Sequence, residues 1–415
     1  MKKLILLISI ISILLTACSP QDTTPSPMPE EPIDGLPIEE PVDETKEEVD
    51  EIQEKLESMT LEEKIGQLMI VGFEGTQLNE NTRSFIEDLK VGGLVFFGRN
   101  IETRDQVVSL VEEIKGLNQG DIPLFLAVDE EGGSVSRVPK EYKRLPDSIK
   151  IGDLDDDDLA FQYGQLLGNR VRSLGLNLDF APVMDIHSNP NNPVIGNRAY
   201  GTTPDRVTKI GLQVAAGLRD RAVIPSIKHF PGHGDTSTDS HIELPVIGKS
   251  LQELRDFELI PFKAAVGEDI EMVMVAHILL PSIDDEFPAT LSSKVIADLL
   301  RGDLGYDGVI ITDDMTMGAI VNNYSLEEAS IKFLKAGGDI LLICHGEENP
   351  SLVFNRIMQA LEDGELSMEE IDKKVYRILE LKKTYLTDEN LQENPYDIQL
   401  EDLNIQAQEI IDRIR

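Results

Sequence analysis

The chain has 415 residues and a formal net charge of −38, from 76 acidic and 38 basic side chains. This charge disfavours binding to nucleic acid or adsorption on an anionic membrane, because both are themselves negatively charged. We interpret it as a solvated acidic surface. Only two cysteines are present, so the fold has no disulfide framework and must be stabilised by burial of an apolar core.

The amino terminus, residues 1–17, has the pattern of a secretory signal peptide. Two lysines precede an apolar run over residues 4–15 that is too short to span a bilayer comfortably. Leu15-Thr16-Ala17-Cys18 resembles a bacterial lipobox, in which the signal peptide is removed and the cysteine is lipidated. We therefore expect a protein held on the extracytoplasmic face of the cell membrane by a lipid anchor at Cys18.

Residues 18–50 form an acidic, proline-rich segment with almost no large apolar side chains. Such a segment cannot bury enough surface to offset its conformational entropy, which predicts a disordered tether. The expected folded domain covers 51–386, and an amphipathic helical tail covers 387–415, with Leu403 and Ile410 among its apolar residues. We expect this tail to pack outside the domain and the protein to be a monomer.

Eight near-continuous apolar runs alternate with helix-like segments, as expected for parallel strands that are buried on both faces. The runs cover residues 68–73, 93–97, 123–129, 176–185, 223–229, 272–277, 309–313 and 339–344. Capping-box spacing marks several helix starts. These pairs are Thr60 with Glu63, Thr103 with Gln106, Ser250 with Glu253, Ser325 with Glu328 and Ser367 with Glu370.

This alternation is typical of a (β/α)8 barrel, although an open doubly wound sheet shares most of it. Polar residues favour the barrel, because each stands at the carboxyl end of a different run, and in a barrel those ends meet at one mouth. They are Asp129, Asp185, His229, His277, Asp313 and His345. We therefore predict an α/β fold with a single (β/α)8 TIM-type barrel.

The segment from Lys228 to His241 contains three histidines, two aspartates and a lysine within fourteen residues. Pro231 and two glycines exclude a regular helix, which predicts a loop after the fifth strand. Within it, Asp239 lies two residues before His241. If the side chains touch, the carboxylate fixes the imidazole tautomer for proton transfer, whereas a purely structural turn is the simpler alternative.

Two adjacent carboxylates, Asp313 and Asp314, end the seventh run. Side chains alternate along a strand, so we expect only one of them, Asp313, to point into the mouth. A carboxylate there serves as a nucleophile, a metal ligand or a helix cap.

We expect no metal, because the closely spaced histidine pair of a helical zinc site needs a helix, and the loop from Lys228 to His241 cannot form one. We expect no cofactor, because no phosphate-binding loop is present. The glycine-flanked serine of an α/β-hydrolase is also missing.

These motifs resemble family 3 glycoside hydrolases of the β-N-acetylglucosaminidase type. The resemblance covers residues 60–386 and rests on the following stretches: Lys228 to Gly234, Asp239 to His241, Ile311 to Met315, Ala127 to Gly133, Asp179 to Asp185 and Asn192 to Arg198. It implies a barrel that removes terminal β-linked N-acetylglucosamine (GlcNAc) with retention, through a covalent glycosyl-aspartate.

The resemblance also assigns residues. Asp313 matches the nucleophile, and His241 matches an acid/base that works with Asp239. The sugar-binding positions are Asp129, Arg137, Arg198, Lys228 and His229. The chain departs from the family at Glu130, where glutamine is usual, and at Ser134, where arginine is usual.

Together these expectations describe a retaining exo-β-N-acetylglucosaminidase acting on GlcNAc-containing peptidoglycan fragments. The alternatives are a family 3 β-glucosidase or other glycosidase, a phosphorylase, and a lipoprotein that only binds muropeptides. An imidazole in place of a carboxylate acid repels an anionic acceptor less, which keeps phosphorolysis open. A substrate-assisted mechanism with Asp313 and Asp314 as the assisting pair is a further variant.

Overall fold

The computed structural model describes residues 50–387, 389–390 and 394–414. The expected signal peptide (1–17), Cys18 and the expected tether up to residue 49 lie outside the described residues. Within the part that is described, no helix is long and apolar enough to cross a membrane.

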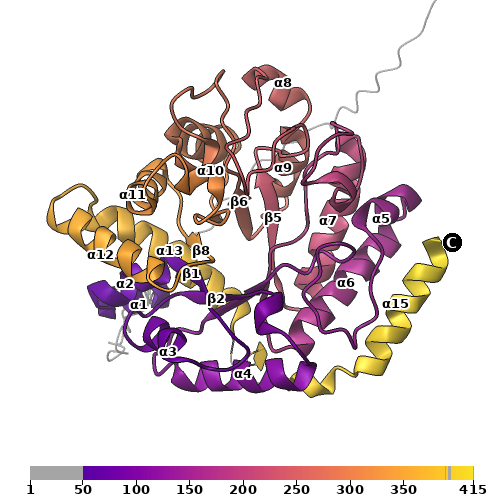
Figure 1. Ribbon diagram of the computed structural model, residues 1–415, viewed down its shortest axis with the longest axis horizontal. Coiled ribbons are helices and arrows are strands. Elements are labelled where there is room, and N and C mark those ends of the chain that lie inside the picture. Colours follow the sequence, from indigo (N-terminus) through magenta and orange to yellow (C-terminus); the bar gives the residue numbers. More distant parts are fainter. Residues whose placement is uncertain (1–49, 388, 391–393, 415) are drawn as a thin grey trace, which may run out of the picture. The chain divides into compact units, whose positions relative to one another are not determined.

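Eight parallel strands form one sheet in the order β7-β6-β5-β4-β3-β2-β1-β8, with helices around the outside (Figure 1). The strands are β1 (Met69–Gly72), β2 (Gly93–Phe96), β3 (Phe125–Val128), β4 (Leu178–Asp179), β5 (Ile224–Phe230), β6 (Met272–Val275), β7 (Val309–Thr312) and β8 (Leu341–Ile343). Each falls on one of the predicted runs, and nearly every strand residue is buried because helices cover the outer face and side chains fill the interior. The predicted barrel is confirmed.

The barrel closes between β7 and β8, where an isolated parallel bridge joins Ile311 and Ile340. Two polar side chains complete this seam. The Asp339 carboxylate accepts the backbone N–H of Ile310 at 2.8 Å, and the Thr312 hydroxyl accepts that of Leu342 at 2.9 Å. The seam therefore depends on side-chain hydrogen bonds as well as on the backbone ladder.

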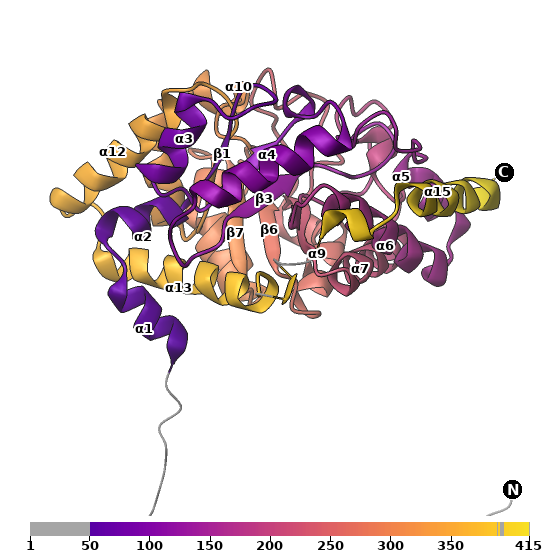
Figure 2. The same ribbon diagram turned by 90° about the horizontal axis from the view of Figure 1, so that it is seen from below.

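The helices lie on the outside of the strands, as the view from below also shows (Figure 2). They are α1 (Glu51–Ser58), α2 (Leu61–Gln67), α3 (Glu80–Glu87), α4 (Arg104–Leu117), α5 (Ser148–Leu154), α6 (Asp157–Ser173), α7 (Pro204–Asp220), α8 (Leu251–Asp256), α9 (Leu259–Val266), α10 (Gly318–Val321), α11 (Leu326–Ala336), α12 (Asn349–Glu362), α13 (Met368–Tyr385) and α15 (Leu400–Ile414). Short 3₁₀ turns are η1 (Gly98–Asn100), η2 (Gly196–Arg198), η3 (Ala289–Leu291) and η5 (Pro395–Asp397), and η4 (Lys294–Asp303) is π-helical.

The predicted capping boxes start α2, α8 and α13 in full, with Thr60, Ser250 and Ser367 as caps. The caps of α4 and α11, Thr103 and Ser325, accept only the N3 backbone N–H. Each box satisfies two of the N–H groups that a helix start leaves unpaired.

The carboxyl-terminal helix α15 packs beside α6 on the outside of the barrel (Figures 1 and 2). Its apolar stripe buries Leu403, Ala407 and Ile410. Before the helix, the backbone carbonyl of Ile398 accepts a hydrogen bond from the Arg104 guanidinium at 2.8 Å. The helix also contacts the loop that follows β3, where the Asn404 side chain accepts the backbone N–H of Lys143 at 2.6 Å and donates to the carbonyl of Glu141 at 3.0 Å.

Candidate active site

A cavity of about 210 Å³ opens where the carboxyl ends of the strands meet. Seven of the eight residues predicted for the site line it. They are Asp129, Arg137, Arg198, Lys228, His229, His241 and Asp313. The eighth, Asp239, does not reach the cavity but contacts His241. Barrel closure thus brings together residues that are up to about half the chain apart.

Lys228, on β5, is the centre of a buried charge network. Its ammonium lies 2.6 Å from Asp129 Oδ1 and 2.6 Å from Glu131 Oε1. Glu131 also receives the Arg198 guanidinium through two bonds, at 2.7 and 2.8 Å. This two-pronged pairing holds the guanidinium in one orientation at the edge of the cavity.

The network keeps its members ionised despite burial. Burial alone would raise the pKa of Glu131, but Arg198 and Lys228 outweigh it and hold that pKa far below its ordinary value. Burial would lower the pKa of Lys228, but Asp129 and Glu131 raise it above the usual range. The cavity wall therefore carries fixed charges that are ready to accept and donate hydrogen bonds to a polar ligand.

His229 and His233 share one buried carboxylate, Asp185. Asp185 Oδ2 lies 2.6 Å from His229 Nδ1, and Oδ1 accepts the backbone N–H of His233 at 2.6 Å. The first contact directs His229 Nε2 away from Asp185, and the ring lines the cavity. Asp185 itself does not line the cavity, so it acts on the site through the two histidines.

Both Asp313 and Asp314 line the cavity, so the expectation that only one of them reaches the mouth is wrong. The reason is that β7 ends at Thr312, and the alternation of a strand no longer applies to the two residues that follow. Asp314 accepts the backbone N–H groups of Thr316 and Cys344 at 2.9 and 3.0 Å. Its carboxylate is therefore tied to the end of β8.

Asp313 has a different environment. Its Oδ1 accepts the backbone N–H of Asp314 at 2.8 Å, and no described residue hydrogen-bonds to Oδ2. Burial raises the pKa of Asp313, but the imidazoles of His229 and His277 outweigh it, so the pKa lies below its ordinary value of 3.8. Asp313 is consequently ionised at neutral pH with one oxygen available.

The predicted pairing of Asp239 with His241 is present. Asp239 Oδ1 lies 2.8 Å from His241 Nδ1 and accepts the backbone N–H of the same residue at 2.9 Å. Nδ1 carries the proton in this pair, which leaves Nε2 as the atom that gains or loses one. The His241 side chain is 65% exposed, although it borders the cavity.

The two positions that depart from the family pattern lie off the cavity. Glu130 is fully buried, pairs with the Arg170 guanidinium at 3.2 Å and accepts the backbone N–H of Arg137 at 2.9 Å. Ser134 is exposed. Glu130 thus fixes the backbone beside Arg137, which itself lines the cavity.

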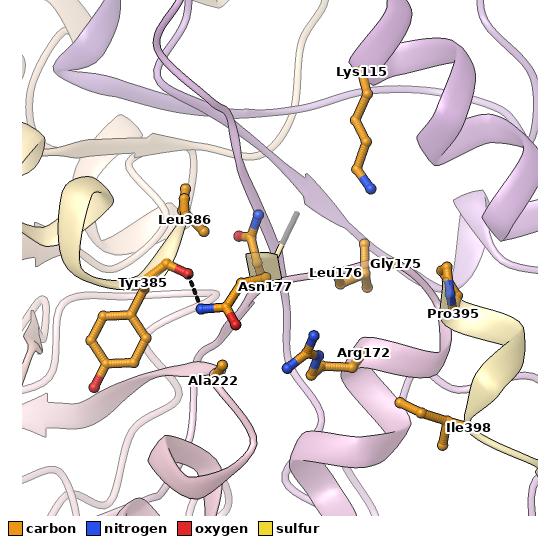
Figure 3. Close-up of a pocket in the computed structure, with 11 residues that line it drawn as sticks. Lys115, Arg172, Gly175, Leu176, Asn177, Ala222, Tyr385, Leu386, Pro395 and Ile398 are labelled. Atoms are coloured by element: carbon orange, nitrogen blue, oxygen red, sulfur yellow. Dashed lines mark hydrogen bonds between the residues drawn. The ribbon is translucent and has the colours of Figure 1, made fainter. Parts of the chain in front are cut away.

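No group of three or more metal-binding side chains is found within the described residues. A further pocket, at the amino ends of β4 and β5 beside Tyr385 and Pro395, is shown in Figure 3. It holds only about 30 Å³ and contains no carboxylate. It is too small for a sugar ring and lies at the end of the barrel opposite to the candidate site.

Sequence reasoning missed Glu131 as a member of the site. A signal was present, since Lys228 and Arg198 are two predicted site cations, and two buried cations need an anionic partner. Phe97, Met317 and Cys344 also line the cavity, but nothing in the sequence marks them as different from ordinary core residues. They reach the cavity because the folded barrel gathers the ends of β2, β7 and β8 around it.

The fold and the cavity define a (β/α)8-barrel enzyme with an ionised carboxylate and a carboxylate-held imidazole at one mouth. The sequence profile of the glycosyl hydrolase family 3 N terminal domain matches residues 60–381. The chain therefore belongs to glycosyl hydrolase family 3.

Individual relatives agree with the family. The chain is 33% identical to β-hexosaminidase A of Pseudoalteromonas piscicida over 332 residues, which cover 74% of this chain and 56% of that protein. It therefore spans little more than half of that relative. It is 37% identical to a β-hexosaminidase of Neisseria meningitidis over 294 residues, 69% of this chain and 79% of the relative.

A solved structure is also similar. The family 3 β-N-acetylglucosaminidase from Paenibacillus sp. str. FPU-7 superimposes with a TM-score of 0.80 at 36% identity, covering 85% of this chain and 68% of that one.

The buried His233 makes a prediction about stability. Burial and the nearby His229 lower the pKa of His233 from 6.5 to about 4. Between these values the unfolded chain binds more protons, so the free energy of unfolding falls as the pH is lowered, by up to about 3 kcal/mol. Urea denaturation at a series of pH values should show that the free energy of unfolding depends less steeply on pH in His233→Gln than in the wild type. Equal slopes would contradict the assignment of a neutral, buried His233.

Proposed function

We propose that this protein is a retaining exo-β-N-acetylglucosaminidase that releases terminal, non-reducing GlcNAc from peptidoglycan fragments through a covalent glycosyl-Asp313 intermediate. The observation that carries the proposal is that Asp313 and His241, whose Nδ1 is held by Asp239, border the same cavity. A retaining glycosidase needs a nucleophilic carboxylate and a proton donor on opposite sides of one glycosidic bond.

In the first step, Asp313 Oδ2 attacks the anomeric carbon while the imidazolium of His241 gives its Nε2 proton to the leaving oxygen. The bond from the anomeric carbon to the leaving group breaks as the bond to Asp313 forms. Asp239 holds Nδ1–H and stabilises the imidazolium in the protonated state. The lowered pKa of Asp313 keeps the nucleophile ionised for this attack.

In the second step, neutral His241 takes a proton from water through Nε2, and the water oxygen attacks the anomeric carbon. The bond to Asp313 breaks, the sugar leaves with its original configuration, and both side chains return to their starting states. One imidazole therefore serves as acid and then as base.

The cavity wall supports recognition of a single sugar. Lys228 and Asp129 offer a charged donor and acceptor, and Arg198 and Arg137 lie beside them. The volume of about 210 Å³ is below the range of about 300–1,000 Å³ common for drug-sized ligands, which fits removal of one terminal ring. GlcNAc as the sugar is supported by the names of the relatives, β-hexosaminidase and β-N-acetylglucosaminidase.

The contacts of Asp314 argue against the substrate-assisted variant. In that variant a second carboxylate has to orient the acetamido group of the substrate. Asp314 Oδ1 is already occupied by the backbone N–H groups of Thr316 and Cys344 and by the Thr316 hydroxyl, and Oδ2 lies 2.8 Å from the same hydroxyl. A direct attack by Asp313 therefore fits the site better.

We also propose that Cys18 carries a lipid that holds the barrel on the extracytoplasmic side of the membrane, where wall fragments are released. The lipobox-like Leu15-Thr16-Ala17-Cys18 supports this. Cys18→Ala should move the protein from the membrane fraction to the soluble one, with hydrolysis of an aryl N-acetylglucosaminide reporting that the barrel is intact. An unchanged membrane fraction would show that Cys18 is not the anchor.

Replacing the proposed acid should make the rate depend on the leaving group. For His241→Ala we expect kcat/KM to fall by about 10²–10⁴-fold on a GlcNAc-capped muropeptide, whose leaving oxygen needs a proton, and far less on a dinitrophenyl glycoside. Asp313→Asn should abolish turnover of both substrates.

Two outcomes would count against this assignment. Equal losses on both substrates for His241→Ala would remove His241 from the role of acid. Failure of the wild type to release GlcNAc from muropeptides, with normal hydrolysis of the aryl glycoside, would reject peptidoglycan fragments as the substrate.

A further inference from the structure

The loop that carries His241 has one buried side chain among exposed ones. Ser237, His241 and Ile242 are exposed, whereas Ser240 is only 2% exposed. Its hydroxyl points inward and lies 3.1 Å from Nε2 of His233. A buried hydroxyl between two catalytic side chains is costly unless it is hydrogen-bonded, so this contact fixes the loop at one point.

The donor in this contact follows from the surroundings of the other ring nitrogen. The Thr236 hydroxyl donates to the backbone carbonyl of His233 at 3.1 Å and lies 2.9 Å from His233 Nδ1. With the single Thr236 proton assigned to the carbonyl, Thr236 accepts from Nδ1–H. His233 Nε2 is then unprotonated, and the Ser240 hydroxyl donates to it.

The imidazole that receives Ser240 is itself rigidly mounted. Asp185 accepts the backbone N–H of His233 at 2.6 Å, and Asn192 donates to the backbone carbonyl of the same residue at 2.9 Å. The ring packs edge-on against His229, with centroids 5.7 Å apart. His233 therefore belongs to the fixed floor of the site, and Ser240 belongs to the exposed loop.

The loop has a second anchor on the side of Asp313. The backbone carbonyls of Ser240 and His241 accept the N–H groups of Ala319 and Gly318, at 3.1 and 3.2 Å, at the start of α10. Gly318 is needed for this approach, since a Cβ there would lie 2.7 Å from the His241 carbonyl oxygen. The Asn322 amide also donates to the Ile242 carbonyl at 3.0 Å on this side, whereas the His233–Ser240 bond ties the loop to the floor of the site through the Ser240 side chain.

We propose that His233 is a positioning residue for the reaction: its hydrogen bond from Ser240 holds the Asp239–His241 pair over the cavity so that the His241 proton reaches the leaving oxygen. The inference rests on the proposed role of His241. Ser240 lies between the two members of the pair, so a shift of Ser240 moves both and displaces Nε2 of His241. Displacement of a proton donor by about 1 Å is enough to lower the rate substantially.

The contact in this direction requires that His233 is neutral in the folded protein. An imidazolium would present N–H at Nε2 and could no longer accept the Ser240 proton. The lowered pKa of His233, caused first by burial and then by His229, keeps the acceptor available down to about pH 4.

The test uses substitutions on both sides of the bond. His233→Leu and Ser240→Ala each remove it, whereas His233→Gln and Ser240→Thr keep a polar partner. Ser237→Ala, on the same loop with an exposed side chain, is the matched control. The measurements are kcat/KM on the GlcNAc-capped muropeptide and on the dinitrophenyl glycoside, together with the thermal midpoint.

We expect His233→Leu and Ser240→Ala to lose about tenfold in kcat/KM on the muropeptide, with a smaller loss on the activated glycoside, because only the former needs the proton. The double variant should be no slower than either single variant, since both remove one bond. His233→Gln and Ser240→Thr should recover part of the loss, and Ser237→Ala should match the wild type. Amide exchange over residues 237–243 should become faster in Ser240→Ala at an unchanged rate of global unfolding.

Equal losses on the two substrates, or losses that add in the double variant, would overturn the proposal. The His241→Ala variant distinguishes failure of the positioning role of His233 from failure of His241 as the acid. If it shows the leaving-group dependence and the His233 and Ser240 variants do not, the positioning role is wrong and the proposed acid stands. If His241→Ala itself shows none, the proposed acid fails and the positioning role fails with it.

Discussion

Closure of the barrel between β7 and β8 is the constraint on which the site depends. The seam is made partly of side chains, with the Asp339 carboxylate and the Thr312 hydroxyl replacing backbone partners. Asp339 is buried and also receives the Arg301 and Arg377 guanidinium groups at 2.5 and 2.9 Å, so its charge is neutralised in place. Two cations thus hold a carboxylate that would otherwise be expensive to bury.

Closure has a direct consequence for the chemistry. Asp313 and Asp314 follow β7, and Asp314 is bound by the backbone N–H of Cys344 at the end of β8. Asp313, the proposed nucleophile, therefore stands directly beside this seam. An open sheet would leave these strand ends apart, and the carboxylates would have no wall on one side.

The proposed proton donor is held in a different way. His241 sits on an exposed loop, attached through the Ser240 hydroxyl and through backbone carbonyls at the start of α10. The proposed combination of a nucleophile beside the seam with a loop-borne donor suits a reaction in which the acid has to approach a glycosidic bond after the sugar has entered. In the proposed mechanism, the buried charges around Lys228 hold the sugar without using Asp313 or His241.

Much of this arrangement could be predicted from sequence because buried parallel strands leave near-continuous apolar runs, and polar residues at their ends stand out against them. All eight strands followed from such local patterns, whereas the pairing of Asp239 with His241 was implied by the family resemblance. The features that the sequence did not predict depend on residues far apart in the chain. Glu131 is defined by cations more than sixty residues away, and Asp314 by the end of β8, which no periodicity reveals.

The central claim is that Asp313 becomes covalently bonded to the sugar, and the direct measurement is to trap that species. A fluorinated N-acetylglucosaminide that slows hydrolysis of a glycosyl-enzyme would be incubated with the full-length protein, followed by proteolysis and mass spectrometry. The account predicts that one peptide gains the mass of a single fluorinated sugar and that the modified side chain is Asp313. An adduct on another residue, or steady turnover of the reagent with no adduct on the protein, would contradict it.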